Sequence, residues 1–239
     1  MYPSRFRYEA PTTLAEAIAI LGSTDDAKVL AGGQSLIPMM KLRFANPATL
    51  VDINNIPGLD AHGADADGTY RIGALCRHAQ LEKSTTLGDH QPTIAAAAPL
   101  VADPIVRTRG TFVGSVCHAD PQGDWASCMV ALDGSITAVG PNGSRSIPVK
   151  KFVSGPFQTV LSRDEIATEA VIQPAQGTRA GGYLKLERRV GDFATAGVAI
   201  ALEMSGGSIT KAGIGLTGVG AQTIDASDAA AALVGSRLE

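Results

Sequence analysis

The chain has 239 residues, a formal net charge of −3 and 5% aromatic residues, a length that allows one large domain or two to three small ones. The slightly acidic balance argues against a nucleic-acid-binding surface, and the short, interrupted apolar stretches argue against a membrane span. The three cysteines form no CxxC pair and the N-terminus has no secretory h-region, so we expect reduced thiols, a cytoplasmic protein and no iron–sulfur cluster held by this chain alone.

The N-terminal segment predicts a small unit of alternating strands and helices. Thr13 and Glu16 match a capping box that opens a helix, and Gly22 is expected to end it. The apolar positions of that helix that recur on one face are Leu14, Ala17, Ile18 and Leu21. Strands are expected on either side of a glycine turn, over residues 28–31 and 50–53.

Further along the chain, the apolar pattern predicts more elements of both kinds. The expected strands cover residues 70–74, 135–139, 195–202 and 209–216, and the expected helices cover residues 94–102, 124–132 and 227–235. Turn-rich segments at 54–58 and 174–177 are typical of boundaries. We therefore expect domains over residues 1–57, 58–176 and 177–239.

The segment from Val29 to Leu36 is the most informative one, because an apolar run stops there at the pair Gly32 and Gly33. Glycine permits positive φ angles and a close approach of the backbone to a ligand. Successive N–H groups in such a turn form a concave anion site, suited to a phosphate or diphosphate. The alternative is an ordinary strand-to-helix turn. Ser35 is no nucleophile elbow, because the last glycine of G-x-S-x-G is missing.

A second glycine segment runs from Arg109 to Val116, and two turns of this kind could clamp one dinucleotide from both sides. The alternative is a β-turn that caps a core helix. A third segment, from Gly213 to Gly218, fits G-x-G-x-x-G. A Rossmann interpretation needs a helix, a returning strand and an acidic residue beyond it, and the remaining tail leaves little room for them.

The first two segments resemble the motifs of the FAD-binding medium subunits of molybdenum hydroxylases, a family that includes aerobic carbon monoxide dehydrogenases and xanthine dehydrogenases. Residues 31–36 match the family pattern A-G-G-x-S-L. Residues 111–115 match T-x-G-G-[SN], except that Val113 stands where a glycine is usual, so Gly114 is expected to keep the flexible position. The resemblance runs from about Phe6 to Gly220. Other matching segments are 38–43, 50–53, 119–121 with Asp124, 155–157 with Thr159 and Leu161, and 183–185 with Arg189 and Asp192.

The fold that this resemblance implies is α+β. Two lobes would form an FAD-binding fold of the vanillyl-alcohol-oxidase/PCMH type, and a C-terminal α+β domain would cover the flavin. Similar chains usually carry several tens of further residues after that domain, so it looks truncated here.

The resemblance also implies how the cofactor is held. The first loop, with the Ser35 hydroxyl, would bind the diphosphate, and the second loop would approach the ribityl diphosphate with the Thr111 hydroxyl as a donor. Asp120 and Asp124 would lie near sugar or ribityl hydroxyls, although either could be a simple helix N-cap. The expected cofactor-binding residues are Ala31, Gly32, Gly33, Gln34, Ser35, Leu36, Thr111, Gly114, Ser115, Asp120, Asp124, Leu161, Tyr183 and Lys185.

The last three residues of that set are expected near the isoalloxazine. Tyr183 would pack beside the ring and Lys185 would lie at its polar edge, where a cation stabilises the reduced anion. The alternatives are an interface aromatic for Tyr183, a solvated lysine for Lys185 and a core position for Leu161. The histidines show no metal-ligand spacing, and no residue of this chain is expected to act as a catalytic acid, base or nucleophile.

The implied function is electron transfer. FAD in this chain would take electrons from the two [2Fe–2S] clusters of a small subunit, after a molybdenum-cofactor large subunit oxidises the substrate. The implied assembly is a dimer of heterotrimers. Two alternatives stay open, an autonomous flavin-dependent oxidase or reductase and a non-redox nucleotide-binding module.

Overall fold

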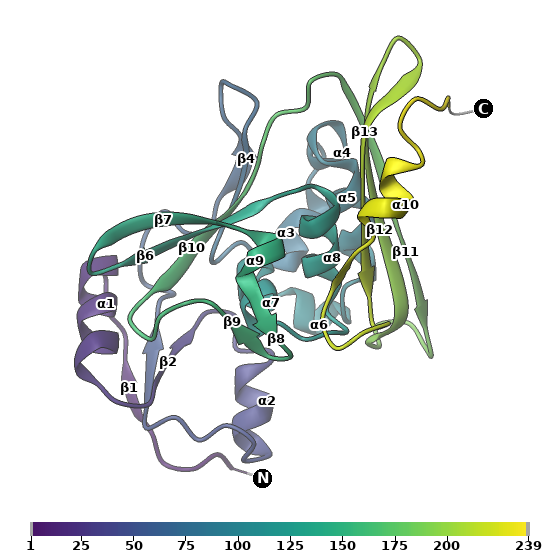
Figure 1. The fold of residues 1–239 in the computed structure, drawn as a ribbon. Coiled ribbons are helices and arrows are strands. Elements are labelled where there is room, and N and C mark those ends of the chain that lie inside the picture. The colour runs from purple at the N-terminus through teal and green to yellow at the C-terminus, as the bar shows by residue number, and fades with distance from the viewer. Residues whose placement is uncertain (1, 238–239) are drawn as a thin grey trace.

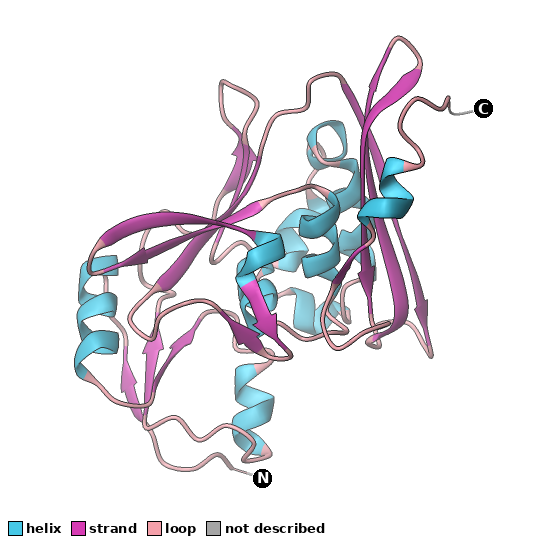
Figure 2. Ribbon diagram, in the orientation of Figure 1, coloured by secondary structure: helices cyan, strands magenta, loops and turns pink. Residues whose placement is uncertain are grey.

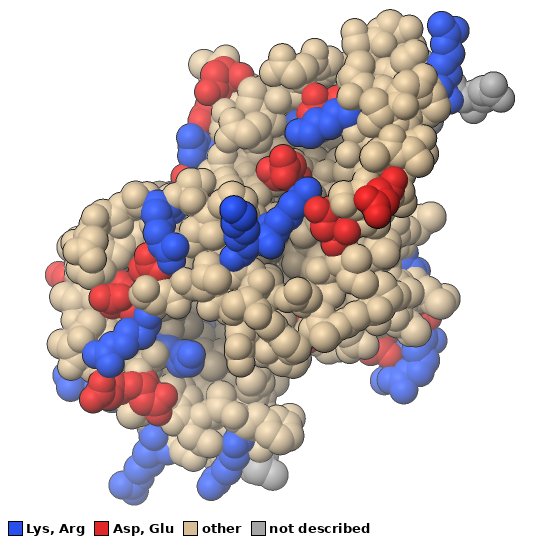
Figure 3. All heavy atoms as spheres, in the orientation of Figure 1, with Lys and Arg blue, Asp and Glu red and all other residues tan. Residues whose placement is uncertain are grey.

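The computed structural model describes residues 2–237, which form three main sheets and a layer of short helices (Figure 1). The small N-terminal sheet lies at one end of the molecule and the long C-terminal strands lie at the other (Figure 2). On the face drawn in Figure 3, acidic and basic side chains are interspersed rather than gathered into one stripe. Within residues 2–237, every helix is too short or too polar to cross a bilayer.

The N-terminal sheet is parallel and has the strand order β1-β3-β2. Its strands are β1 (Arg7–Glu9), β2 (Ala27–Leu30) and β3 (Thr49–Asp52). Parallel neighbours need crossover connections. Helix α1 (Leu14–Ser23) lies in the first crossover, and helix α2 (Leu36–Lys41) lies in the second. The predicted unit of alternating strands and helices is therefore confirmed.

The second sheet is antiparallel, with the order β4-β5-β10-β6-β7. Its strands are β4 (His62–Ala64), β5 (Tyr70–Gly73), β6 (Ser135–Gly140), β7 (Gly143–Pro148) and β10 (Ile166–Ile172). The connection from β5 to β6 supplies most helices of the molecule. They are α3 (His78–Lys83), α4 (Leu87–His90), α5 (Pro92–Ala97), the 3-10 turn η1 (Ala98–Leu100), α6 (Pro104–Arg107), α7 (Phe112–His118) and α8 (Asp124–Ala131). After β7 come α9 (Val149–Phe152) and the small pair β8 (Val153–Gly155) and β9 (Gln158–Thr159).

The C-terminal sheet is a meander in the order β11-β12-β13-β14. It comprises β11 (Thr178–Glu187), β12 (Ala194–Ser205), β13 (Ser208–Thr217) and β14 (Ile224–Asp225), followed by helix α10 (Ser227–Ala231). The third glycine motif starts on β13. Cβ atoms at Gly213 and Gly215 would collide with backbone carbonyls of α8, so these glycines allow close helix–sheet packing instead of forming a nucleotide turn.

The central helices join the two antiparallel sheets into one core. Helix α7 packs against β5 and β10, whereas α5 and α8 pack against β11, β12 and β13. A continuous cluster of buried apolar side chains runs from Ala17 in α1 to Ala201 in the C-terminal sheet. The boundaries at residues 57 and 176 stay a prediction, because the packing itself does not stop there.

Several expected elements differ in extent. The helix expected over 94–102 begins earlier, at Pro92, and changes to a 3-10 turn after Ala97. Ala102 has a φ of +52°, which no helix allows. The helix expected over 227–235 ends at Ala231. Glu16 accepts the N–H of Thr12 rather than that of the N-cap, so the predicted capping box is only half formed, by Thr13.

Candidate functional site

The first glycine loop connects β2 to α2 and leaves its N–H groups available. Gly33 has a φ of +74°, a conformation that favours glycine over residues with a Cβ. Within residues 2–237, the backbone N–H groups of Gly32, Gly33, Gln34 and Ser35 donate to no protein acceptor. The Ser35 hydroxyl does not cap α2. Unpaired donors at the end of a strand fit an external anion.

The two glycine segments lie directly against each other. A Cβ at Gly32 would collide with the Arg109 carbonyl oxygen and would lie 2.8 Å from the Cα of Gly110. A Cβ at Gly114 would lie 3.9 Å from that of Ala31. The structure therefore brings together the two halves of the predicted dinucleotide site, and Gly32 permits their closest approach.

The second glycine segment is the start of a helix and not a flexible turn. Thr111 is the N-cap of α7, and its hydroxyl oxygen accepts the N–H of Gly114 at 3.2 Å. The expectation that Gly114 keeps a flexible backbone position is wrong, because Gly114 is helical and has no positive φ. Its lack of a side chain instead makes room for the Thr111 hydroxyl, which would lie 2.5 Å from a Cβ there.

Two residues outside the expected set, Asn54 and Arg77, connect the two glycine segments through side-chain hydrogen bonds. The Asn54 Nδ2 donates to the carbonyl of Ala31 at 2.8 Å. The Arg77 guanidinium donates to the carbonyl of Arg109 at 2.7 Å and also to the Oδ1 of Asn54. Asn54 lies in a turn-rich segment that was interpreted only as a boundary, and no local pattern marks Arg77.

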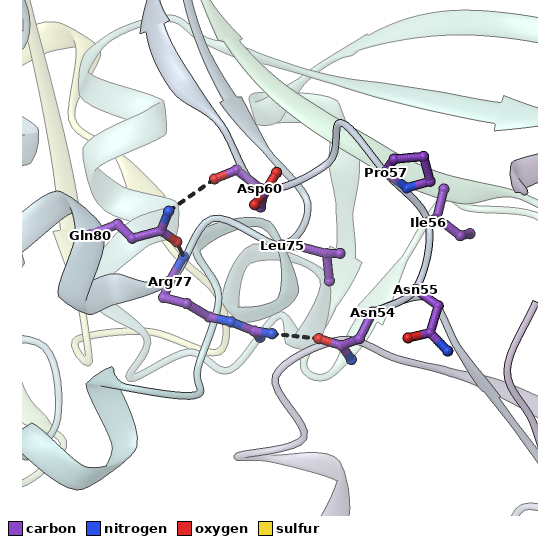
Figure 4. Close-up of a pocket in the computed structure, with 8 residues that line it drawn as sticks. All are labelled: Asn54, Asn55, Ile56, Pro57, Asp60, Leu75, Arg77 and Gln80. Atoms are coloured by element: carbon purple, nitrogen blue, oxygen red, sulfur yellow. Dashed lines mark hydrogen bonds between the residues drawn. The ribbon is translucent and has the colours of Figure 1, made fainter. Parts of the chain in front are cut away.

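A polar pocket of about 260 Å³ opens beside this pair (Figure 4). Its lining comprises Asn54, Asn55, Ile56, Pro57, Asp60, Leu75, Arg77 and Gln80. In Figure 4 the Arg77 side chain extends from the start of α3 toward Asn54, and Gln80 connects the Arg77 backbone to the carbonyl of Asp60.

The second loop rests on a buried histidine. The Nδ1 of His78 accepts the indole N–H of Trp125 at 3.0 Å, and both side chains are buried. A Cβ at Gly110 would lie 2.7 Å from the Nε2 of His78, so glycine is required above the ring. Burial, with help from the cations Arg107 and Arg77, lowers the pKa of His78 to about 4. The ring is therefore neutral at neutral pH.

Comparison with known proteins assigns the chain to a family. Residues 4–175 match the model described as the FAD binding domain in molybdopterin dehydrogenase. Residues 182–239 match the CO dehydrogenase flavoprotein C-terminal domain. The chain belongs to the FAD-binding medium subunits of molybdenum hydroxylases.

Individual relatives support this assignment. The medium chain of carbon monoxide dehydrogenase from Hydrogenophaga pseudoflava is 43% identical over 222 residues, which are 92% of this chain and 76% of the relative. The nicotine 6-hydroxylase medium subunit from Paenarthrobacter nicotinovorans is 35% identical over 233 residues, which are 97% of this chain and 81% of the relative.

Solved structures agree with this fold. A chain of carbon monoxide dehydrogenase from Hydrogenophaga pseudoflava superimposes with a TM-score of 0.94 at 41% identity, covering 100% of this chain and 83% of that one. Quinoline 2-oxidoreductase from Pseudomonas putida 86 gives a TM-score of 0.91 at 31% identity, with 100% and 83% covered. The expected α+β FAD-binding fold with a second domain is confirmed, and so are FAD as the cofactor and the class of flavoprotein oxidoreductase subunit.

In this medium subunit, three of the expected cofactor residues form a buried polar group of their own. The Tyr183 hydroxyl donates to the Asp124 carboxylate at 2.6 Å, and the Lys185 Nζ lies 3.4 Å from the other carboxylate oxygen. The same Nζ donates to the carbonyl of Leu100 at 2.9 Å and lies 3.4 Å from Glu187. Burial raises the pKa of Asp124, although Tyr183 and Lys185 oppose that shift.

This arrangement decides between the alternatives for Lys185. Its side chain is 1% exposed, so it is not the solvated lysine considered from the sequence. It joins the third sheet to the helical layer through Leu100. A buried cation surrounded by two carboxylates and a carbonyl is held in one place, so any action on a flavin would proceed from that fixed position.

Three further expected residues are Asp120, Leu161 and Ser115, of which Ser115 belongs to the second glycine segment. Asp120 accepts the N–H of Gln122 at 2.9 Å and so orders the turn before α8. Leu161 is partly buried and packs on the core. Ser115 is half-buried within α7. In the described part of the chain, no hydrogen bond connects Asp120 or Leu161 to either glycine segment.

The backbone N–H groups of the first loop give this site the means to bind an anion. Burial raises the pKa of Cys76 to about 12, so that residue is a thiol and not a nucleophile at neutral pH. Among residues 2–237 no group of three or more acidic, histidine or cysteine side chains is placed to hold a metal ion. The free N–H groups and the two glycine segments fit the diphosphate of FAD.

Proposed function

We propose that this chain is the electron-transfer subunit of a molybdenum hydroxylase complex, taking electrons from the [2Fe–2S] clusters of a small subunit and passing them to an external acceptor. The observation that carries the proposal is the contact of Gly32 with the backbone of Arg109 and Gly110. This contact supports the proposal because both glycine segments would then be within reach of one dinucleotide.

The proposed work of the residues is to bind and orient. The free N–H groups of residues 32–35 and the Ser35 hydroxyl would donate to the diphosphate. The Thr111 hydroxyl accepts one N–H of its own helix and keeps its hydrogen to donate to the cofactor. Bound FAD would supply the redox chemistry, since a flavin exchanges electrons one or two at a time.

The residues beyond the loops would act as a group. Asp124 keeps lone pairs free after binding Tyr183 and Lys185, and these are available to a ribityl or sugar hydroxyl. We also include Leu36, Ser115, Asp120 and Leu161 in the proposed cofactor environment.

The names of the relatives, which are medium chains and medium subunits, support a complex with other subunits. We propose a molybdenum-cofactor large subunit and a [2Fe–2S] small subunit, assembled as a dimer of heterotrimers in the cytoplasm.

The test is the identity of the retained flavin. The purified full chain should be yellow, and the flavin released by heat should migrate as FAD and not as FMN. The physical reason is that two glycine segments exceed what one terminal phosphate needs. FMN in the extract, or no flavin after reconstitution with FAD, would contradict the proposal.

A further inference from the structure

Asn54 and Arg77 form a continuous hydrogen-bonded connection between the two glycine loops. It runs from the Ala31 carbonyl to Asn54, then to the Arg77 guanidinium, and then to the Arg109 carbonyl. Each end is a backbone atom of a different loop. The Asn54–Arg77 bridge therefore ties the backbone of one loop to the backbone of the other.

Both residues of the bridge are themselves fixed. The backbone N–H of Asn54 donates to Asp52 at 2.9 Å, directly after β3. The backbone N–H of Arg77 donates to Gln80 at 2.7 Å, and Arg77 pairs with Thr111 in an isolated β-bridge. The backbone of each residue is therefore held beside a regular element, Asn54 after β3 and Arg77 at the start of α3.

The charge of Arg77 is also not cancelled by an ion pair. Its guanidinium partners are a carbonyl and an amide, and within residues 2–237 no carboxylate lies within ion-pair distance of it. Asp52 and Asp60 act on the Arg77 guanidinium only through longer-range attraction, which the repulsion from the Arg109 cation opposes. A guanidinium stays protonated in proteins, so positive potential remains beside loops that present free N–H groups.

We propose that Asn54 and Arg77 are positioning residues that set the separation of the two glycine loops and so preorganise the diphosphate site. This inference rests on the proposed binding of FAD between those loops. Neither side chain needs to touch the cofactor. The bridge holds the carbonyls of Ala31 and Arg109 in place, and this directs the neighbouring N–H groups toward one point.

The test measures ligand affinity on the full chain after FAD has been removed. Asn54→Ala and Arg77→Met each break the bridge at a different link. Each should weaken the binding of FAD and of ADP by about tenfold or more, the effect expected from one lost hydrogen bond of this kind. Binding of riboflavin, which has no diphosphate, should change far less.

The two links belong to one connection, so their effects should not add. The double variant should bind FAD about as weakly as the weaker single variant, since either substitution already separates the loops. Arg77→Lys should remain weak, because an ammonium lacks the planar fork that reaches two acceptors. Rescue by lysine would mean that charge alone matters and would overturn the positioning role.

Arg71→Met is the matched control. Arg71 lies on β5 of the same lobe and forms ion pairs with Asp65 and Glu169, both at 2.7 Å, without contacting either loop. The Arg71→Met variant should lose some thermal stability and keep its affinity for FAD. If Arg77→Met does not fold, as judged by thermal melting, Asn54→Ala and Arg77→Lys carry the test.

The outcomes separate the two proposals. If the wild-type chain binds FAD and ADP while the bridge variants bind them equally well, the bridge has no positioning role. The same conclusion follows if the single effects multiply in the double variant, or if the Arg71 control weakens binding as much. A wild-type chain that binds neither FAD nor ADP would refute the proposed function itself, and the bridge with it.

Discussion

At the scale of single residues, the buried polar side chains carry the most consequence, because a polar group removed from water needs partners inside the fold. Asp124 and Lys185 pair where the third sheet meets the helical layer, and the neutral His78 lies against Gly110 of the second glycine segment. Asp124 and Lys185 have hydrogen-bond partners on both sides of their junction, and the Nδ1 of His78 accepts the Trp125 indole N–H. A change in the protonation of His78 therefore changes the stability of the fold.

His78 predicts a dependence of stability on pH. Its pKa falls from 6.5 to about 4 on folding, so between these values the unfolded chain binds more protons than the folded one. The contribution of neutral His78 to the free energy of unfolding is fully present above pH 6.5, and it is lost as the pH falls through about 4. The shift corresponds to about 3 kcal/mol in the free energy of unfolding.

Urea unfolding of the wild type and of His78→Gln at several pH values checks this. Gln keeps an acceptor for Trp125 but does not titrate, so the difference in stability between the two proteins should shrink toward acid pH. His62 and His118 also have lowered pKa values but are present in both proteins, so they cancel. A constant difference would contradict a buried neutral His78.

At the scale of elements, the site depends on how closely one loop approaches the first turn of a helix. The first loop leaves β2 and the second leads into α7, and the backbone at Gly32 touches the backbone before α7. This contact is between main chains. It therefore tolerates no side chain at Gly32, whereas Gly33 is required for a different reason, its φ of +74°.

Gly32→Ala should push the two elements apart. The added Cβ would collide with the Arg109 carbonyl, and overpacking of this kind costs about 1–3 kcal/mol of stability. Because the N–H donors then no longer converge, the affinity for FAD should fall by about tenfold or more. Fluorescence titration of the flavin-free chain measures this.

Gly88→Ala is the control for that substitution. Gly88 lies in α4, and a Cβ there would meet nothing within 4 Å. Alanine is favoured over glycine in a helix, so this variant should be at least as stable as the wild type and should bind FAD normally. Unchanged FAD binding by Gly32→Ala would show that the contact between the loops does not define the site.

At the scale of the whole molecule, one continuous core joins the two lobes to the C-terminal sheet. The Tyr183–Asp124 hydrogen bond and the Lys185–Leu100 hydrogen bond cross the same junction. The third sheet is therefore packed on the helical layer rather than hinged from it. A molecule built in this way is suited to hold a cofactor in a fixed position relative to docked partners.

This architecture predicts that the chain with FAD alone is a poor catalyst. No acid–base pair or activated nucleophile is expected from its sequence, so organic substrate should be turned over only when the molybdenum and iron–sulfur subunits are added back. Steady-state assays of the separate chain and of the reconstituted complex check this. Robust oxidation of an organic substrate by the chain and FAD alone would favour an autonomous oxidase instead.

Much of the fold could be predicted from the sequence because its signals are local. The glycines at 32 and 33, the cap at Thr13 and the strands over 28–31 and 50–53 each depend on a few neighbouring residues. At the second glycine segment the alternative of a cap on a core helix is the one found, since Thr111 caps α7. Backbone preference within one segment decides such features, and it acts in the chain before any tertiary contact forms.

The sequence by itself determined the family, the FAD cofactor and the two loops that would hold it. Only the tertiary structure decided that Arg77 and Asn54 connect those loops, that Gly32 is a contact point and that Lys185 is buried. The physical reason is distance along the chain. Tyr183 meets Asp124 across 59 residues, and such a pair leaves no local pattern, because it arises from how the sheets and helices pack and not from the residues beside it.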